Sequence, residues 1–236
     1  MASEPITRVA VITGAAGHLG RVVAGAFANT GVARVLIDID AVALTQTFGA
    51  DRADQLLAPT NLLDAASLST AAAAAMKKFG RIDILCNVAG GFRMGHPVHA
   101  TPDEDWRAMI DLNAGSVLRA CHAFVPHMLA TGAGKIINIA ATAGLRGGAD
   151  MGAYAASKSA VIRLTESMSA ELCDRGINVN CILPSIIDTP PNRAAMPQAD
   201  PTKWVCPEAL ADVILFLASH QARAIHGAAI PVVGLV

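Results

Sequence analysis

The chain has 236 residues, 53% of them hydrophobic, and a formal net charge of −1. A charge this close to zero gives no electrostatic reason to expect a nucleic-acid partner or binding to an anionic membrane. No apolar run is long enough to span a bilayer, and the N-terminal MASEPITRVA lacks the basic and apolar regions of a signal peptide.

Strand-like and helix-like segments alternate along the chain. Apolar, β-rich runs predict strands at 7–13, 33–39, 83–89, 135–141, 177–183 and 228–233. Helical signals lie between them: an alanine run ending at Gly80, a capping box at 101–104 with proline at the first helical position, and an apolar stripe over 161–172. No linker divides the chain. These repeated units predict a single α/β domain over 1–236, a doubly wound parallel sheet with helices on both faces.

The stretch TGAAGHLG, residues 13–20, follows the first predicted strand and opens the first predicted helix. Gly14, Gly17 and Gly20 would let the strand turn sharply into a helix whose N-terminal amides face a phosphate. Asp38 ends the second strand, where a carboxylate can accept hydrogen bonds from an adenosine ribose and repels a 2′-phosphate. The partial positive charge of His18 weakly favours a 2′-phosphate, but the full negative charge of Asp38 outweighs it. The pattern predicts a dinucleotide site that prefers NAD(H) to NADP(H).

Tyr154 and Lys158 stand four residues apart and so share one face of a predicted helix. An ammonium beside a phenol favours the phenolate, so we expect Lys158 to lower the pKa of Tyr154. Taken alone, such a pair is more often structural, with the tyrosine in the core and the lysine in solvent. His96 and His99 have no third ligand at a suitable spacing, so no metal site is predicted. Five scattered cysteines without a CxxC motif are typical of reduced thiols, and we expect a cytoplasmic protein.

Over nearly its whole length the chain resembles the short-chain dehydrogenase/reductase family, whose fold is of the Rossmann type. The resemblance rests on TGAAGHLG, Asp38, NVAG (87–90), DLNAG (111–115), YAASK (154–158) and PSIIDT (184–189). It implies that Tyr154 is the general acid/base, that Lys158 holds the nicotinamide ribose, and that Asn113 anchors a water in a proton relay. The residues it implies beside the cofactor are Gly14, Gly17, His18, Leu19, Gly20, Asp38, Asn61, Leu62, Asn87, Ala89, Gly90, Tyr154, Lys158, Pro184, Ile187 and Thr189.

The chain departs from the family pattern at three positions. His18 replaces the second glycine of the loop, and Ser185 stands where the family has a glycine after Pro184. The third departure is Ala141, which occupies the place of the family's catalytic serine, thirteen residues before the tyrosine. Thr142 is a candidate substitute, but adjacent strand residues point to opposite faces, so it would need a bulge to aim its hydroxyl.

The leading functional hypothesis is NAD(H)-dependent hydride transfer to or from a small carbonyl/alcohol pair. A dihydropteridine-reductase-like activity is the alternative, because residues 188–204 are similar to the corresponding loop of those enzymes and Ala141 fits a substrate that needs less oxyanion help. A third hypothesis is a non-catalytic NAD-binding regulator. The proline-rich stretch 189–207 predicts a substrate lid. The resemblance also implies a homotetramer joined by the helices after Thr101 and Tyr154, although their apolar residues would serve equally as intrachain core.

Overall fold

The computed structural model describes residues 8–236, so Thr7 of the first predicted strand and the predicted absence of a signal peptide lie outside the described residues. Across that range seven strands form one sheet in the order β3-β2-β1-β4-β5-β6-β7, with every neighbouring pair parallel. The chain order reverses between β1 and β4, and a crevice for ligands is expected at such a point. The predicted doubly wound parallel sheet is confirmed. The strands are β1 (Val9–Thr13), β2 (Ala33–Asp38), β3 (Gln55–Pro59), β4 (Ile84–Asn87), β5 (Gly134–Ile139), β6 (Ile177–Pro184) and β7 (Ala229–Val232).

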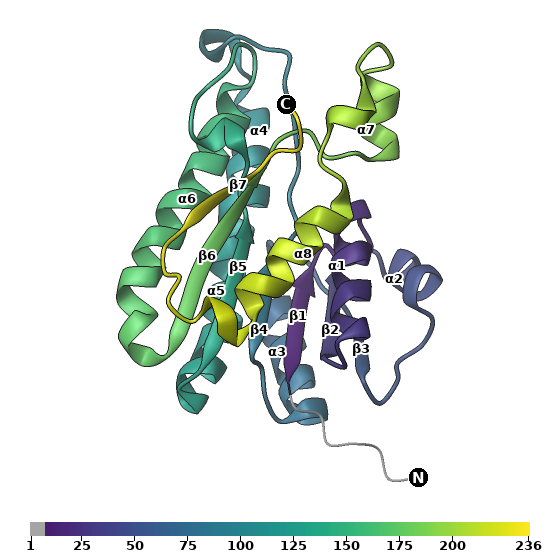
Figure 1. Ribbon diagram of the computed structural model, residues 1–236, viewed down its shortest axis with the longest axis vertical. Coiled ribbons are helices and arrows are strands. Elements are labelled where there is room, and N and C mark those ends of the chain that lie inside the picture. Colours follow the sequence, from purple (N-terminus) through teal and green to yellow (C-terminus); the bar gives the residue numbers. More distant parts are fainter. Residues whose placement is uncertain (1–7) are drawn as a thin grey trace.

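Helices cover both faces of the sheet and enclose two apolar cores. One face carries α1 (His18–Asn29), α2 (Ala41–Phe48) and α8 (Pro207–Ala218), and the other carries α3 (Ala65–Phe79), α5 (Ser116–Thr131) and α6 (Gly152–Leu172). Figure 1 shows α8 crossing in front of the sheet beside α1. Alternation along β1 explains its continuous apolar run, because Val9 and Val11 enter one core while Ala10 and Ile12 enter the other.

Two short helices belong to neither layer. The first is α4 (Asp103–Met109), which runs through a π-helical stretch, Ile110–Gly115, into α5. The second is α7 (Pro190–Ala195), which stands apart from the sheet at the upper right of Figure 1. None of the helices within residues 8–236 has both the length and the apolar character needed to cross a membrane.

All six predicted strands are present, with ends that differ from the predicted ones by at most two residues, whereas one capping box and one edge strand differ from the prediction. Helix α3 ends at Gly80, which adopts φ 72° as a left-handed cap should. The predicted capping box at 101–104 is wrong, because the Thr101 hydroxyl donates backwards to the Pro97 carbonyl (3.3 Å) and α4 begins only at Asp103. The edge strand β3 was not predicted, since QLLAP contains no β-branched residue and ends in proline.

Candidate active site

A cleft of about 450 Å³ opens at the carboxyl ends of the strands around the β1/β4 reversal. Its wall includes most of the predicted cofactor residues, namely Gly14, Gly17, His18, Leu19, Gly20, Asp38, Asn61, Leu62, Ala89, Gly90, Ile187 and Thr189. It also includes six residues that were not predicted to bind the cofactor: Ile39, Thr60, Leu63, Val88, Leu112 and Asn192. Val88 and Leu112 lie inside the NVAG and DLNAG motifs and Asn192 lies in the predicted lid, whereas the other three each follow a strand end or a predicted residue.

The glycine loop between β1 and α1 is packed too tightly for side chains. Gly14 has φ +65°, and a Cβ there would lie 2.8 Å from the Ala89 Cα. A Cβ on Gly20 would lie 2.0 Å from the Gly14 carbonyl oxygen. These two glycines therefore let the loop close onto the end of β4, which leaves the N-terminus of α1 facing the cleft, the arrangement that binds a pyrophosphate in dinucleotide sites.

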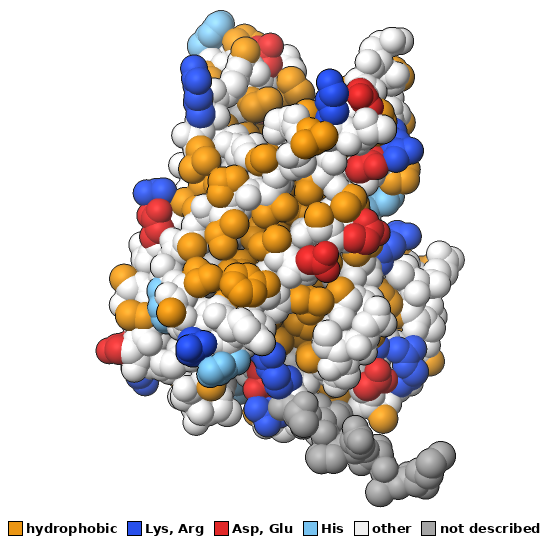
Figure 2. All heavy atoms as spheres, viewed as in Figure 1, with side chains coloured by type: hydrophobic (Ala, Val, Ile, Leu, Met, Phe, Trp, Pro, Cys, Tyr) orange, Lys and Arg blue, Asp and Glu red, His pale blue; other side chains and the backbone are white. Residues whose placement is uncertain are grey.

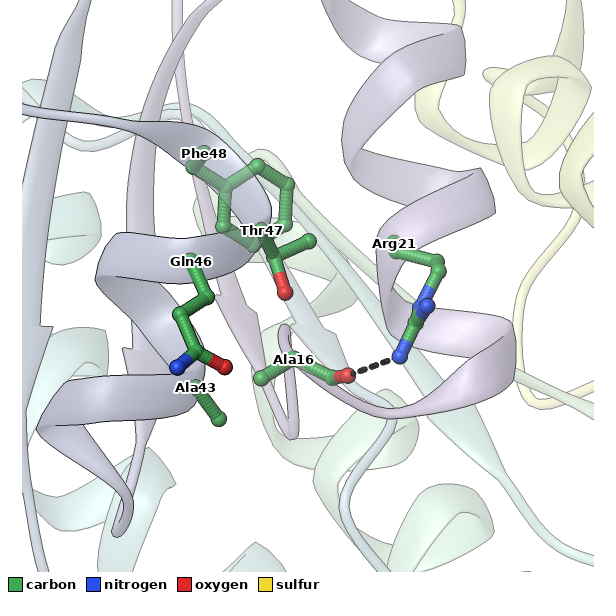
Figure 3. A pocket seen from close by; sticks show the side chains of 6 residues that line it. All are labelled: Ala16, Arg21, Ala43, Gln46, Thr47 and Phe48. Carbon is green, nitrogen blue, oxygen red and sulfur yellow. Dashed lines mark hydrogen bonds between the residues drawn. The ribbon is translucent and has the colours of Figure 1, made fainter.

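The backbone of Ala16 is hydrogen-bonded to side chains at both its N–H and its carbonyl. The half-buried Asp38 carboxylate accepts a hydrogen bond from the Ala16 N–H at 3.0 Å. On the other side Arg21, in the first turn of α1, donates from Nη2 to the Ala16 carbonyl at 2.9 Å, as the dashed line in Figure 3 shows. Asp38 is thus fixed at the cleft wall by the loop itself, and the hollow between α1 and α2 in Figure 3 lies behind that loop.

The Asn113 and Lys158 side chains meet beside Gly90, and the Tyr154 ring lies next to Lys158. The buried Lys158 ammonium donates to the Ile139 carbonyl (2.9 Å) and lies 6.0 Å from the centroid of the Tyr154 ring. A Cβ on Gly90 would lie 2.8 Å from Asn113 Oδ1 and 3.1 Å from Lys158 Nζ. Since Gly90 also lines the cleft, Asn113 and Lys158 lie beside the predicted cofactor site, with the Tyr154 ring next to Lys158.

Asn113 is held by a network that the sequence did not reveal. It is buried in the π-helical stretch, a deformation that is frequent at functional sites. Its Nδ2 donates to the Ser157 hydroxyl (2.9 Å) and the Gly91 carbonyl (3.1 Å), and its Oδ1 accepts from the Gly91 N–H (2.9 Å). The buried Ser157 hydroxyl in turn donates to the Tyr154 carbonyl (2.7 Å). Ser157 lies within YAASK, but nothing in the motif distinguishes it from a core serine.

Burial governs the ionisation of Tyr154 and Lys158. Desolvation raises the pKa of Tyr154 to about 12 and lowers the pKa of Lys158 to about 8, because a charge is costly in a low-dielectric interior. In the protein alone the net shift of the Tyr154 pKa is upward, because desolvation dominates it. At neutral pH Tyr154 is a neutral phenol, which can donate a proton.

The Thr142 hydroxyl has its one hydrogen bond, among residues 8–236, to the Pro184 carbonyl (3.4 Å). The rule that adjacent strand residues point to opposite faces does not apply to Thr142, because β5 ends at Ile139 and Thr142 starts a 3₁₀ turn. Ala141, at the serine position, is buried. The Thr142 hydroxyl thus reaches the Pro184 carbonyl without a β-bulge in the strand.

Four of the predicted cofactor residues, Asn87, Tyr154, Lys158 and Pro184, do not line the cleft wall. Asn87 is buried at the end of β4, where its Nδ2 donates to Asn138 Oδ1 (2.9 Å) and its own Oδ1 has no partner among the described residues. Pro184 is buried in β6 and contributes the carbonyl that accepts from Thr142. Within residues 8–236 no three His, Cys, Asp or Glu residues gather as a metal site would require.

Known proteins match this chain along most of its length. Residues 8–200 match the family described as short chain dehydrogenase. The chain is 33% identical to the 2-(R)-hydroxypropyl-CoM dehydrogenase of Xanthobacter autotrophicus, over 95% of this chain and 96% of that protein. It is 34% identical to the D-threitol dehydrogenase of Mycolicibacterium smegmatis, over 94% and 89%. A crystal structure of carveol dehydrogenase from Mycobacterium avium in complex with NAD superposes with a TM-score of 0.87 and 27% identity, covering 97% of this chain and 96% of that one.

Proposed function

The chain belongs to the short-chain dehydrogenase family, and from that premise we propose that it is an NAD(H)-dependent oxidoreductase acting on a small alcohol/carbonyl pair. One observation carries the proposal. Gly90 lines the cleft and lies so close to Asn113 and Lys158 that a Cβ would meet both side chains, and Lys158 lies beside Tyr154, so a cofactor in the cleft would reach Tyr154. Family membership makes the protein an oxidoreductase, which favours an enzyme over the non-catalytic regulator.

The residues of the cleft fit NAD. The tight glycine cradle brings backbone amides to the pyrophosphate position, and the Asp38 carboxylate stands where it would accept hydrogen bonds from the hydroxyls of an adenosine ribose. When bound, NAD supplies the acceptor or donor of hydride. Thr189 and Ile187, which line the cleft beside Asn192, are proposed to hold the carboxamide end. A 2′-phosphate would face the negative charge of Asp38.

Proton transfer is assigned to Tyr154. In reduction its neutral phenol gives a proton to the substrate oxygen, and in oxidation its phenolate takes the proton back. Lys158, with its ammonium fixed by the Ile139 carbonyl, is proposed to hold the nicotinamide ribose and to stabilise the phenolate. Asn113 is proposed to anchor the proton-relay water, and its side chain is already held by Gly91 and Ser157.

A dihydropteridine-reductase-like activity remains the second candidate, for one reason. Ala141 has no hydroxyl, and the Thr142 hydroxyl is bound to the Pro184 carbonyl. Losing an oxyanion donor typically costs about 10²–10³ in rate when negative charge develops on oxygen. An electron-poor heterocycle would need that donor less than a simple ketone does.

The lid proposal covers residues 189–207. Its two ends are pinned together, because Ile187 pairs with Val205 as a parallel bridge and the Asp188 N–H donates to the Val205 carbonyl (2.8 Å). Arg193 on α7 donates to both Asp188 carboxylate oxygens, at 2.6 and 2.7 Å. Asn192 on the same helix lines the cleft. Trp204 is buried in the pinned base, so it is a poor reporter of motion at the lid tip.

We propose a cytoplasmic homotetramer. Trp106 on α4 and Leu118 on α5 are exposed large hydrophobic residues, which supports an interface on the helices after Thr101. Figure 2 shows hydrophobic side chains gathered over α8 and β7, which offers a second apolar face. All five cysteines are free, as reduced thiols would be.

The experiment that tests the proposed activity follows NADH absorbance against a panel of secondary alcohols, ketones, acyl thioesters, quinones and quinonoid dihydropterin. We expect turnover with an alcohol or ketone. Turnover with quinonoid dihydropterin alone would favour the second candidate, and no turnover with any member would contradict both.

A further inference from the structure

Phe92 is an exposed aromatic residue that packs directly on Tyr154. Its ring centroid lies 4.8 Å from that of Tyr154, with the two planes at 85°, an edge-to-face contact. Yet 56% of Phe92 remains accessible. A large apolar ring left open beside the only tyrosine of the chain offers a surface for a hydrocarbon group, because covering it removes apolar area from water.

The loop that carries Phe92 is held in place at both ends. Before Phe92, the N–H and the carbonyl of Gly91 are both bonded to the Asn113 amide. After it, the Gly95 N–H donates to the Asp150 carbonyl (2.8 Å), and His96 pairs with Met151 as a parallel bridge. Asp150 is the one non-glycine residue of 8–236 with positive φ (59°), a strained conformation typical of functional sites. Phe92 is therefore presented by a fixed loop.

Two side chains in the loops next to Tyr154 are exposed and apolar, and two nearby arginines are paired with carboxylates. Met94, two residues after Phe92, and Leu145, in the loop before Tyr154, are both exposed hydrophobic residues. The Arg93 guanidinium is paired with Asp105, and the Arg193 guanidinium with Asp188. Arg146 forms no ion pair within the described part of the chain, so an anionic substrate is the competing class.

We propose that Phe92 is a specificity-determining residue. The substrate is an alcohol or ketone whose reacting carbon belongs to a ring or carries a branched hydrocarbon, and this apolar part packs against the Phe92 ring. The inference rests on the proposed function, since the substrate oxygen must meet the Tyr154 hydroxyl. With the two rings in contact, a substrate at that hydroxyl brings its hydrocarbon part beside Phe92. Burying the exposed ring against hydrocarbon then favours bulky apolar substrates over small or charged ones.

The test compares cyclohexanol with isopropanol as substrates for NAD reduction, because both are secondary alcohols and differ in apolar bulk. In the wild type kcat/KM should favour cyclohexanol by at least about tenfold, and Phe92→Ala should remove most of that preference through KM, with isopropanol changed by less than about twofold. Phe92→Tyr keeps the ring and should keep the preference. Phe48→Ala, which truncates the phenylalanine at the end of α2, is the matched control and should leave kcat/KM unchanged for both alcohols.

Each other outcome decides the matter. Equal losses on both alcohols in Phe92→Ala would show that Phe92 only positions Tyr154, and a preference for a hydroxycarboxylate over cyclohexanol would place an anion in the site; either result overturns the inference. If the wild type turns over no alcohol or ketone, the proposed function fails separately. Binding of cyclohexanone to the NADH complex, followed by the ring signals of the single tyrosine, then decides: saturable binding lost in Phe92→Ala supports the inference, and no binding overturns it.

Discussion

Tyr154 and Lys158 are each pushed towards their neutral forms by burial, and this sets the pH behaviour of the site. The pKa of Tyr154 is raised to about 12 and that of Lys158 is lowered to about 8. A neutral phenol is ready to protonate the oxygen of a carbonyl substrate, whereas alcohol oxidation needs the phenolate. Oxidation should therefore become faster as pH rises towards the tyrosine pKa, while reduction should not need high pH.

The ionisation of Tyr154 can be measured without interference, because the chain contains one tyrosine. We expect the phenolate absorbance of the native protein to appear above the ordinary tyrosine pKa of about 10. The protein unfolded in urea should titrate at the ordinary value, and Tyr154→Phe should give no phenolate signal. A native midpoint at or below about 10 would contradict the account of Tyr154 as a desolvated phenol.

Asp38 determines the cofactor preference. NAD should bind at least about tenfold more tightly than NADP, because a 2′-phosphate meets the carboxylate. Asp38→Asn removes the charge while keeping an acceptor for the Ala16 N–H. It should therefore strengthen NADP binding and reduce the difference in affinity between NAD and NADP. Calorimetry with both cofactors measures this. Equal affinities in the wild type would refute this role for Asp38.

At the scale of elements, the sequence predicted what depends on local chemistry. The apolar runs, the glycine loop and the Gly80 cap follow from local backbone and burial rules, so six strands and the end of α3 were recognisable. The predicted capping box failed because the Thr101 hydroxyl bonds to Pro97 instead. The strand predicted over 135–141 ends at Ile139, so the alternation of strand side chains does not decide where the Thr142 hydroxyl points.

The unpredicted parts of the site depend on contacts between distant segments. Asn113, Gly91 and Ser157 come from three segments, and no spacing in the chain reveals that one amide joins them. The direction of the Tyr154 pKa shift is likewise a consequence of burial, which a four-residue spacing does not contain.

The proposed lid makes a prediction about one element, α7. Binding of NADH should slow amide hydrogen exchange over 190–203, because Asn192 on this helix lines the cleft. Arg193→Gln removes the pair with Asp188, so exchange over α7 should speed up in the free protein while α3, on the far face of the sheet, stays unchanged. Equal exchange over α7 with and without cofactor would contradict the lid.

At the scale of the whole molecule, the prediction is that four copies of the chain assemble into a homotetramer. Light scattering at micromolar concentration should give about four times the chain mass of 24.2 kDa. Trp106→Glu places a charge on the exposed apolar surface of α4, so it should reduce the mass, whereas Lys77→Glu on α3 should not. A monomer mass for the wild type would rule the assembly out.

The central claim is that this chain transfers hydride with Tyr154 as its acid/base group, and Tyr154→Phe tests it most directly. The variant removes one hydroxyl and little contact area, so NADH affinity measured by fluorescence titration should stay within about threefold of the wild type. Turnover of the best alcohol or ketone from the panel should fall by at least about a hundredfold, as expected for losing general acid–base catalysis. Near-wild-type turnover with intact NADH binding would contradict the account.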